Sequence, residues 1–375
     1  GGDYEPGPPL TPRLGGELRR KNTRLDCCGG SAIRKRLRSP VARSCRIATG
    51  LSLGFQLFTF HFSLFEMQIH YGTENLQIVN PVVTIGSFDG VHKGHVQVIE
   101  SLKRVARNLK GETVIISFEP HPREVLYPME KRPGILTTLE EKAAILATYG
   151  VEHLVVLQFT RSLAELEYAD FVRHILVDKI GLKGLVVGYD HRFGKNREGT
   201  FEKLKELADR YHFYLEQEEV YEENQINISS TKIRNALQIG DIDRVNEFLG
   251  YTYSVSGKVV AGDKIGRSMG FPTANIRLND DRKLLPAAGV YAVKVKVEGQ
   301  EYRGMLNIGV RPTVSCSGVV RIEVNIFDFD ADIYGKEIRL LLIARIRGER
   351  KFNGIDELSE QLKKDRQEVS VLLQQ

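Results

Sequence analysis

Cysteine is scarce in most of this chain. Only one cysteine, Cys316, follows residue 66, and the other three lie before it: Cys27, Cys28 and Cys45. A single cysteine in residues 67–375 excludes a disulfide framework. The reducing cytoplasm is therefore the expected location.

A large excess of positive charge is also missing from most of the chain. The formal net charge of +5 arises in residues 1–66, where 11 Lys and Arg residues accompany 5 Asp and Glu residues. Residues 67–375 contain 42 basic and 43 acidic residues, which is a net charge of −1. Such a nearly neutral body has no basic face for nucleic acid, so we expect no nucleic-acid partner.

Methionine is rare as well, and the first of the four is Met67. The segment before it is rich in arginine and then apolar from Ile47 onward. Basic residues followed by an apolar stretch can form a signal anchor, but Gln56 and His61 interrupt this one. Residues 1–66 are therefore interpreted as a non-native or disordered extension in preference to a membrane anchor, and no membrane partner is expected.

The rest of the chain is long enough for two or more cores, and GSFDGVHKGH, residues 86–95, is its most informative stretch. It follows a β-branched run at residues 81–85 that is typical of a buried parallel strand. It precedes an amphipathic helical pattern. A glycine turn between strand end and helix start is where an open α/β sheet binds ligands, and the positive helix end suits phosphate.

His92 and His95 are three residues apart, so both can face a ligand from the first helical turn. Histidine is also the side chain most readily charged near neutral pH. Two other interpretations remain. The glycines can form only a turn, and the histidines can bind a metal, although zinc needs three or four ligands and the single nearby carboxylate is Asp89. The complete string favours a nucleotide-handling site.

Strand patterns alternate with helical patterns up to about residue 250. Further strands are expected at residues 113–118 and 185–187, and within GVEHLVVLQF and YHFYLEQEEV. This alternation predicts a doubly wound parallel sheet with right-handed crossovers. Polar loops after residues 85, 118 and 187 then converge on one edge of the sheet, so the site is expected to be composite.

INISSTKIRNALQIGD closes this first module with a predicted helix. Ser229, Ser230 and Thr231 offer capping hydroxyls at its start. Lys232 and Arg234 lie in its first turn, where cations oppose the helix dipole, so an anion at this end would explain them. An ordinary serine-capped helix with basic residues in water is the alternative.

These motifs resemble those of the HxGH nucleotidyltransferases, and FDGVH is similar to the form found in bacterial bifunctional riboflavin kinase/FMN adenylyltransferases. SFEPHP, GYDHRFGKNREG and ISSTKIR follow in the expected order. The resemblance implies a Rossmann-like domain over residues 67–250 that adenylylates FMN with ATP, with His92 and His95 catalytic and Asp190 near FMN. It places around ATP a set of nine residues: Gly86, Phe88, Asp89, Gly90, His92, His95, Ser230, Thr231 and Arg234.

Period-2 patterns dominate the chain after residue 250. GVYAVKVKVEG, EYRGMLNIGV, VRIEVNIFDF and EIRLLLIARIR have the character of strands, with no helical pattern between them. They predict a small antiparallel β-barrel. One amphipathic helix, from Ile355 to about Leu373, is expected to cover one side of it.

Three polar residues stand out in this second module. Thr273 and Asn275 are two apart, so they share a face of an extended segment, and their oxygens suit Mg²⁺. A turn with ordinary hydrogen bonds is the alternative. Glu323 lies between Ile322 and Val324 in a predicted strand. Inside a barrel its carboxylate would be costly to bury unless it were functional, whereas pointing outward it would be unremarkable.

The second module resembles riboflavin kinase through GKVVAGDKIGRSMGFPTAN, LLPAAGVYAV, NIGVRPT, IEVNIFDFDADIYGKEI and RGERKF. The resemblance implies a kinase domain over residues 251–375, with Glu323 as the base for the riboflavin 5′-hydroxyl and Mg²⁺ on Thr273 and Asn275. The implied ATP and flavin contacts are Gly262, Gly266, Arg267, Gly270, Thr273, Asn275 and Arg311. Asn325 and Gly348 depart from the family, where His and an acidic residue are common.

The expected activity is bifunctional. Riboflavin and ATP give FMN, and FMN and a second ATP give FAD and pyrophosphate, with Mg²⁺ as cofactor. A monofunctional kinase with a degenerate first module and a flavin-binding regulator without turnover are the alternatives. The complete HxGH string disfavours the first, and intact Thr273, Asn275 and Glu323 disfavour the second. The sequence does not indicate the oligomeric state.

Overall fold

The structure is a computed structural model that describes residues 67–127, 134–189, 194–195, 198–218, 222–223, 226–262, 266, 270–311 and 319–374. All of its described elements belong to one compact unit, which spans Phe62–Gln375. Outside the described residues lie the expected extension, residues 1–66, and three single residues named above: Asp190, Arg267 and Cys316. Arg311 ends a strand, but its side chain also lies outside the description.

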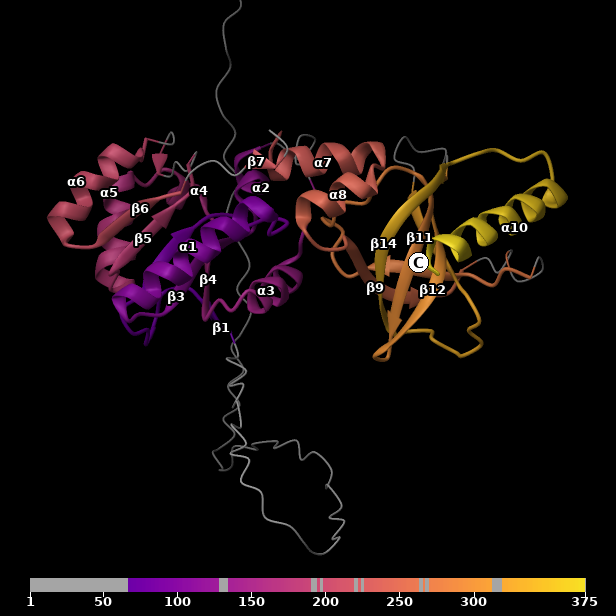
Figure 1. Ribbon diagram of the computed structural model, residues 1–375, viewed down its shortest axis with the longest axis horizontal. Helices are drawn as coiled ribbons and strands as arrows, with labels where there is room; N and C mark the ends of the chain where they lie inside the picture. The colour runs from indigo at the N-terminus through magenta and orange to yellow at the C-terminus, as the bar shows by residue number, and fades with distance from the viewer. Residues whose placement is uncertain are drawn as a thin grey trace, which may run out of the picture. The chain divides into compact units, whose positions relative to one another are not determined.

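A parallel sheet forms the first part of the described chain (Figure 1). Its strand order is β1-β4-β3-β2-β5-β6, and each neighbouring pair runs parallel. The central strands are apolar and buried on both faces, as expected when helices cover both sides. The strands are β1 (Gln68–Tyr71), β2 (Val82–Ile85), β3 (Thr113–Glu119), β4 (His153–Gln158), β5 (Gly184–Val187) and β6 (Tyr214–Gln217).

Helices cover the two faces of this sheet separately. Val82 belongs to a core with α1 and α3, whereas its neighbour Val83 belongs to a second core with η2 and α6. This confirms the predicted doubly wound architecture. The helices are α1 (Lys93–Leu109), α2 (Pro122–Leu126), α3 (Leu139–Thr148), α4 (Arg161–Ala164), α5 (Tyr168–Asp170), the π-helical η2 (Phe171–Ile180), α6 (Phe201–Tyr211), α7 (Ser230–Ile239) and α8 (Ile242–Leu249).

The first strand of the sheet escaped the sequence prediction. Strand β1 lies at the edge of the sheet beside β4, and most of its residues are exposed. It therefore lacks the buried β-branched run that marks the central strands. A short antiparallel pair, β7 (Glu222–Glu223) and β8 (Ile226–Asn227), precedes α7.

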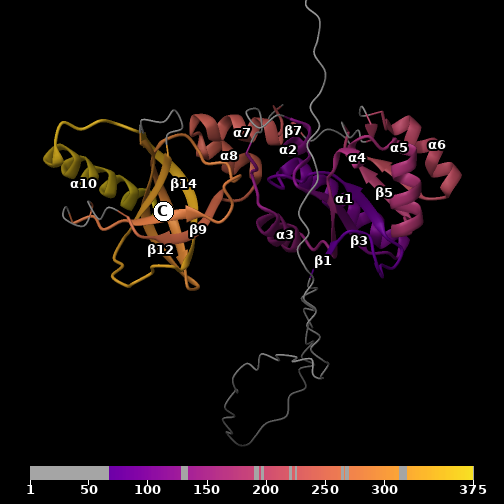
Figure 2. The same cartoon turned by 180° about the vertical axis from the view of Figure 1, so that it is seen from behind.

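The second part of the described chain is a closed antiparallel barrel in the order β10-β13-β12-β11-β14-β9, which confirms the predicted barrel. Alternate residues such as Val293 and Val324 fill its interior. Helix α10 (Ile355–Leu372) lies against β11 and β12 in both views (Figures 1 and 2). The strands are β9 (Ser254–Val260), β10 (Ala274–Leu278), β11 (Gly289–Val297), β12 (Gln300–Arg311), β13 (Val319–Ile326) and β14 (Glu337–Gly348).

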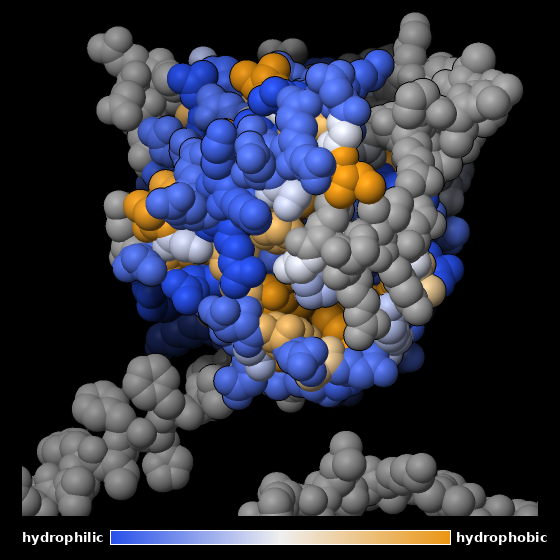
Figure 3. All heavy atoms as spheres, turned by 90° about the vertical axis from the view of Figure 1, so that its right-hand side faces the viewer, coloured by the Kyte–Doolittle hydropathy of each residue, from blue (hydrophilic) through white to orange (hydrophobic). Residues whose placement is uncertain are grey.

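Helix α10 is amphipathic, as its sequence predicted. Val369 is fully buried and packs with Met305 and Phe327 on the outer face of the barrel. Hydrophilic side chains dominate the coloured surface seen from this end of the molecule (Figure 3).

Within the described part of the chain, no helix is both long enough and apolar enough to cross a bilayer. The apolar stretch that suggested a signal anchor lies outside the described residues.

Candidate functional site

The structure brings together residues of two predicted sites. The first site lies at the carboxyl ends of β3, β2 and β5. These strands are neighbours in the sheet and run parallel, so the loops that follow them meet at one edge, as predicted. GSFDGVHKGH joins β2 to α1, and His92 is the N-cap residue of that helix.

The two histidines of this turn lie face to face. The rings of His92 and His95 stack with their centroids 3.7 Å apart, and the ring of Phe88 lies 4.8 Å from that of His95. The backbone N–H of His95 donates to Nδ1 of His92 at 3.3 Å. A Cβ at Gly94 would come within 3.2 Å of the same Nδ1, so a glycine here leaves room for the capping imidazole.

His95 is a buried histidine with an unsatisfied ring nitrogen. Burial lowers its pKa well below the ordinary histidine value, and the neighbouring His92 and Lys142 lower it further. Its Nδ1 is buried and has no hydrogen-bond partner among the described residues. Buried polar atoms are rarely left without a partner, so this nitrogen fits a group that arrives with a substrate.

The turn before the histidines has an unusual backbone. Phe88, Gly90 and Val91 all have left-handed φ angles, of 46°, 86° and 36°. Left-handed angles are easily adopted by glycine but are strained for phenylalanine and valine, above all for a β-branched residue. The surrounding contacts must therefore hold this turn in place.

Asp89 and Arg234 supply part of that support. Oδ1 of Asp89 accepts hydrogen bonds from the backbone N–H groups of Leu136 and Thr137, at 2.9 and 3.0 Å. Its other carboxylate oxygen pairs with Arg234, whose Nε donates to the carbonyl oxygen of Gly134 at 3.0 Å. Both side chains are buried and face the protein. Their predicted contact with ATP stays a prediction.

The start of α7 lies beside the same turn. Ser230 Oγ donates to the carbonyl oxygen of Asp89 at 2.9 Å, and Ser229 caps the helix by accepting from the N–H of Lys232. Thr231 is exposed at the helix start. The structure thus joins ISSTKIR to FDGVH across about 140 residues.

Lys142 is a residue of this site that the sequence prediction missed. It is 4% exposed, and its Nζ donates to Ser117 Oγ at 2.9 Å. Ser117 in turn donates to the carbonyl oxygen of Ser87 in the glycine turn. Burial lowers the pKa of Lys142. A signal was present, because helical spacing places this lysine on the same face of α3 as Leu139 and Leu146.

The second predicted site lies on the outside of the barrel. Glu323 is directly opposite Asn275 on β10 and opposite Asn307 on β12. Its neighbours Ile322 and Val324 belong to the barrel core, so the carboxylate points outward. The side chain of Glu323 remains 25% exposed. The question of its orientation, which the sequence left open, is thereby answered.

A glycine-bearing loop approaches this outer face. A Cβ at Gly262 would collide with the amide of Asn275, and one at Gly266 would lie 3.6 Å from Cγ2 of Thr273. Gly270 has a left-handed φ of 76°. The structure thus brings Gly262 and Gly266 to the segment that contains Thr273 and Asn275.

Asn325, one of the departures from the family pattern, anchors the same loop. Its Nδ2 donates to the carbonyl oxygen of Pro272 at 2.7 Å. The donor lies two residues after Glu323 on the same strand, so it faces the same side of the sheet. Asn325 thus fixes the chain immediately before Thr273.

The donor atoms on this face fit Mg²⁺. A threonine hydroxyl, an asparagine amide oxygen and a carboxylate are hard oxygen ligands of the kind that Mg²⁺ prefers. In the described ranges, no group of three or more His, Cys, Asp and Glu side chains could hold a metal ion. Thr273 and Asn275 offer two such oxygens, which suits a magnesium ion that takes water and nucleotide phosphates as its other ligands.

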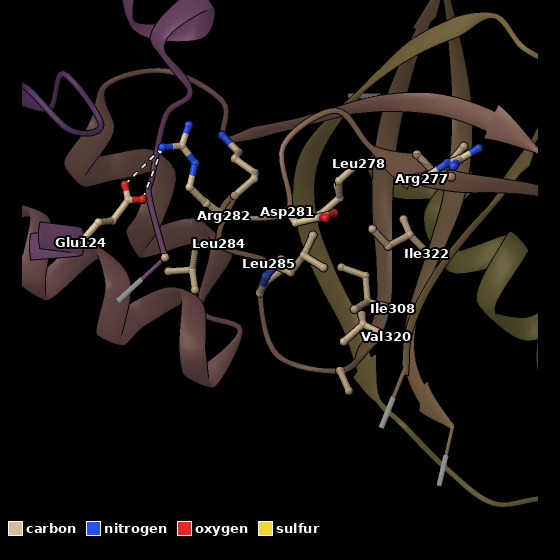
Figure 4. A pocket seen from close by; sticks show the side chains of 15 residues that line it. Glu124, Arg277, Leu278, Asp281, Arg282, Leu284, Leu285, Ile308, Val320 and Ile322 are labelled. Atoms are coloured by element: carbon tan, nitrogen blue, oxygen red, sulfur yellow. Dashed lines mark hydrogen bonds and ion pairs between the residues drawn. The ribbon is translucent and has the colours of Figure 1, made fainter. Parts of the chain in front are cut away.

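A cavity of about 920 Å³ lies beside β10, β12 and β13 (Figure 4). Figure 4 shows an apolar wall on the barrel side and the ion pair between Arg282 and Glu124 on the other. The apolar wall includes Leu278, Leu285, Ile308, Val320 and Ile322. None of the predicted site residues lines this cavity, so it belongs to neither predicted site.

Comparison with known proteins identifies the two modules of the chain. A family model described as FAD synthetase matches residues 76–232, and one described as riboflavin kinase matches residues 249–373. The bifunctional riboflavin kinase/FMN adenylyltransferase of Listeria monocytogenes is 40% identical, over 79% of this chain and 94% of the relative. The protein of the same name from Escherichia coli is 39% identical, over 76% and 90%.

A solved structure is also similar. The crystal structure of a protein named as a macrolide-efflux protein from Streptococcus pneumoniae matches with a TM-score of 0.73 and 32% identity. The match covers 80% of this chain and 98% of that one. The two chains therefore share both domains of the fold.

These findings define the class first. The chain joins an FAD synthetase domain to a riboflavin kinase domain. It belongs to the bifunctional riboflavin kinase/FMN adenylyltransferase family, as its motifs predicted.

Proposed function

We propose that this protein phosphorylates riboflavin to FMN and then adenylylates FMN to FAD. The observation that carries this proposal is the similarity to relatives named for both activities, at 40% identity over 94% of the Listeria protein. The low cysteine content of residues 67–375 supports a cytoplasmic location.

The adenylyltransferase reaction is assigned to residues 67–250. The FMN phosphate is already an anionic nucleophile, so it can attack the α-phosphorus of ATP without a general base, and pyrophosphate leaves. The residues must position ATP in line and neutralise charge on pyrophosphate. We assign that role to His92, His95, the turn that begins at Gly86, and the starts of α1 and α7, the second of which contains Ser230.

The remaining assignments for this domain follow the family pattern. Phe88 packs beside His95, and the Gly90 backbone continues the same turn. Thr231 and Arg234 complete the proposed ATP contacts at the start of α7. Asp190 is proposed to contact FMN, although it lies outside the described residues.

The kinase reaction is assigned to residues 251–375. The riboflavin 5′-hydroxyl is neutral, so Glu323 accepts its proton while the oxygen attacks the γ-phosphorus of ATP and ADP leaves. Thr273 and Asn275 hold Mg²⁺, which neutralises phosphate charge when bound. The glycine-bearing loop, with Gly262, Gly266, Arg267 and Gly270, and Arg311 at the end of β12 complete the proposed ATP and flavin contacts.

Chromatographic separation of flavins tests the proposal. The full chain is incubated with riboflavin, ATP and Mg²⁺, and the products are followed over time. Accumulation of FMN followed by FAD supports both activities. FMN alone would favour the monofunctional kinase, and binding of riboflavin without any product would favour the regulator.

A further inference from the structure

The strained turn of the adenylyltransferase domain is held partly by residues of the kinase domain. Both backbone polar groups of Gly90 are hydrogen-bonded: its N–H donates to Thr137 Oγ1 at 3.0 Å, and its carbonyl oxygen accepts from Tyr251 Oη at 2.6 Å. Tyr251 belongs to the kinase domain as proposed above. Thr137, which accepts from the N–H, follows Leu136, and Leu136 is in turn bound by Lys283 of the kinase domain.

Lys283 secures the segment to which the turn is bound. Its Nζ donates to the carbonyl oxygen of Leu136 and to Oε2 of Glu141, both at 2.6 Å. The N–H of the same Leu136 donates to Asp89 in the turn. A single residue, Leu136, therefore connects the kinase-domain lysine to the glycine turn through its two backbone polar groups.

The backbone around Lys283 adds to this connection. The N–H of Ile135 donates to the carbonyl oxygen of Arg282, and the N–H of Leu284 donates to that of Ile135, both at 2.9 Å. Arg282 also pairs with Glu119 and Glu124 of the adenylyltransferase domain, at 2.6 and 3.3 Å, the second of which Figure 4 shows. The loop after β10 thus pairs like a short strand with the segment around Ile135 and Leu136, to which the turn is bound.

The placement of Lys283 is costly unless its contacts matter. It is 6% exposed and lies 4.4 Å from the centre of the Tyr253 ring. Burial lowers its pKa, while Glu141 opposes that effect. A buried ammonium group is tolerated only if it is paired and hydrogen-bonded. Loss of one member of such an ion pair leaves the other charge buried without a partner, at the full cost of its desolvation. Glu141 also caps α3, so removal of Lys283 disturbs two supports of the turn.

We propose that Lys283 and Tyr251 are positioning residues for FAD formation, supplied by the kinase domain to hold the ATP-binding turn of the adenylyltransferase domain. The inference rests on the adenylyltransferase activity proposed above. It predicts a one-way dependence, because the contacts reach the HxGH turn but do not include Thr273, Asn275 or Glu323. Loss of either residue should impair FAD formation and spare FMN formation.

The test uses Lys283→Met and Tyr251→Phe in the full chain, with Lys283→Arg as the conservative variant. Rates of FMN formation from riboflavin and of FAD formation from supplied FMN are measured separately. Because the turn binds ATP, KM for ATP in the FAD reaction should rise by about ten-fold, since small displacements of a reacting group are costly. KM for FMN and the kinase rate should stay at wild-type values, and Lys283→Arg should recover part of the loss.

Lys294→Met is the matched control, because Lys294 is also a kinase-domain lysine paired with a glutamate but its side chain is 45% exposed. It should leave both reactions unchanged. Unchanged FAD kinetics in both test variants would overturn the inference, and so would an equal loss of the two activities at constant KM. If Lys283→Met does not fold, Tyr251→Phe decides, because it removes a single hydroxyl. A wild-type chain that makes no FAD would instead refute the proposed function itself.

Discussion

Asn275 and Glu323 lie directly opposite each other on the antiparallel strands β10 and β13. Opposed side chains on one face of an antiparallel pair are close enough to act on one ligand. The sequence places them almost fifty residues apart, and only the barrel register brings them together. The amide oxygen proposed to bind Mg²⁺ and the carboxylate proposed to accept the proton therefore share one patch of the outer surface.

The first prediction concerns Glu323→Gln. The amide preserves the shape of the side chain but cannot accept the proton of the riboflavin 5′-hydroxyl, so FMN formation should fall by about a hundred-fold or more. FAD formation from supplied FMN should remain at the wild-type rate, because the HxGH turn is untouched. Both rates are measured by flavin chromatography.

Glu301→Gln provides the control for that change. Glu301 lies on β12 of the same barrel and pairs with Lys294 and Lys296 on the surface. Its replacement should affect neither reaction. A Glu323→Gln enzyme that still makes FMN at the wild-type rate would remove Glu323 from the role of base.

The second prediction concerns His95→Ala. Loss of the imidazole removes a buried donor beside the proposed ATP phosphates, so FAD formation should fall by about a hundred- to a thousand-fold. FMN formation should persist. His174→Ala is the control, because His174 is an exposed histidine on η2 that pairs with Asp170 and Asp178. Loss of both activities in folded His95→Ala would contradict two separate sites.

The sequence predicted the architecture because its patterns are local. Buried β-branched runs marked the central strands, and period-2 patterns marked the barrel. The exposed edge strand β1 has no such pattern and was missed.

The site was predicted less completely, because part of it depends on contacts between distant residues. His92 and His95 lie in one motif, so their proximity followed from helical spacing. Lys283 lies 147 residues from Leu136, whose carbonyl oxygen it binds. Nothing in the surrounding sequence, NDDRKLLP, indicates that this lysine is buried. The outward orientation of Glu323 likewise required the register of the barrel.

The third prediction concerns Lys142→Met. This change removes the buried ammonium group that donates to Ser117 and lies near His95. If that charge supports the proposed ATP site, FAD formation should fall by about ten-fold or more while FMN formation is retained. Lys205→Met, on the exposed side of α6, is the control and should change neither rate. An unchanged FAD rate in Lys142→Met would limit this lysine to a packing role.

The fourth prediction concerns stability at acidic pH and depends on His121. This histidine caps α2 by accepting at Nδ1 from the N–H of Arg123, which requires an unprotonated nitrogen. Burial, above all, lowers its pKa to about 4, and nearby Arg234, Lys142 and Arg123 contribute while Asp89 opposes. In the unfolded chain histidine titrates near about 6.5.

The sign of the effect follows from which state binds the proton first. Above the unfolded pKa both states are neutral at His121, so its full contribution to stability is present. As pH falls through the window between the two pKa values, the unfolded chain takes up the proton before the folded one, so the free energy of unfolding decreases. A shift of this size costs about 2 kcal/mol by about pH 5.

His121→Asn isolates this effect, because asparagine can still cap the helix but does not titrate in this range. Denaturant unfolding at neutral pH and at about pH 5 should show a smaller loss of stability for the variant than for the wild-type chain. His174→Asn, at an exposed position, should retain the wild-type pH dependence. Equal pH dependence in wild type and His121→Asn would mean that His121 titrates at its ordinary pKa in the folded protein.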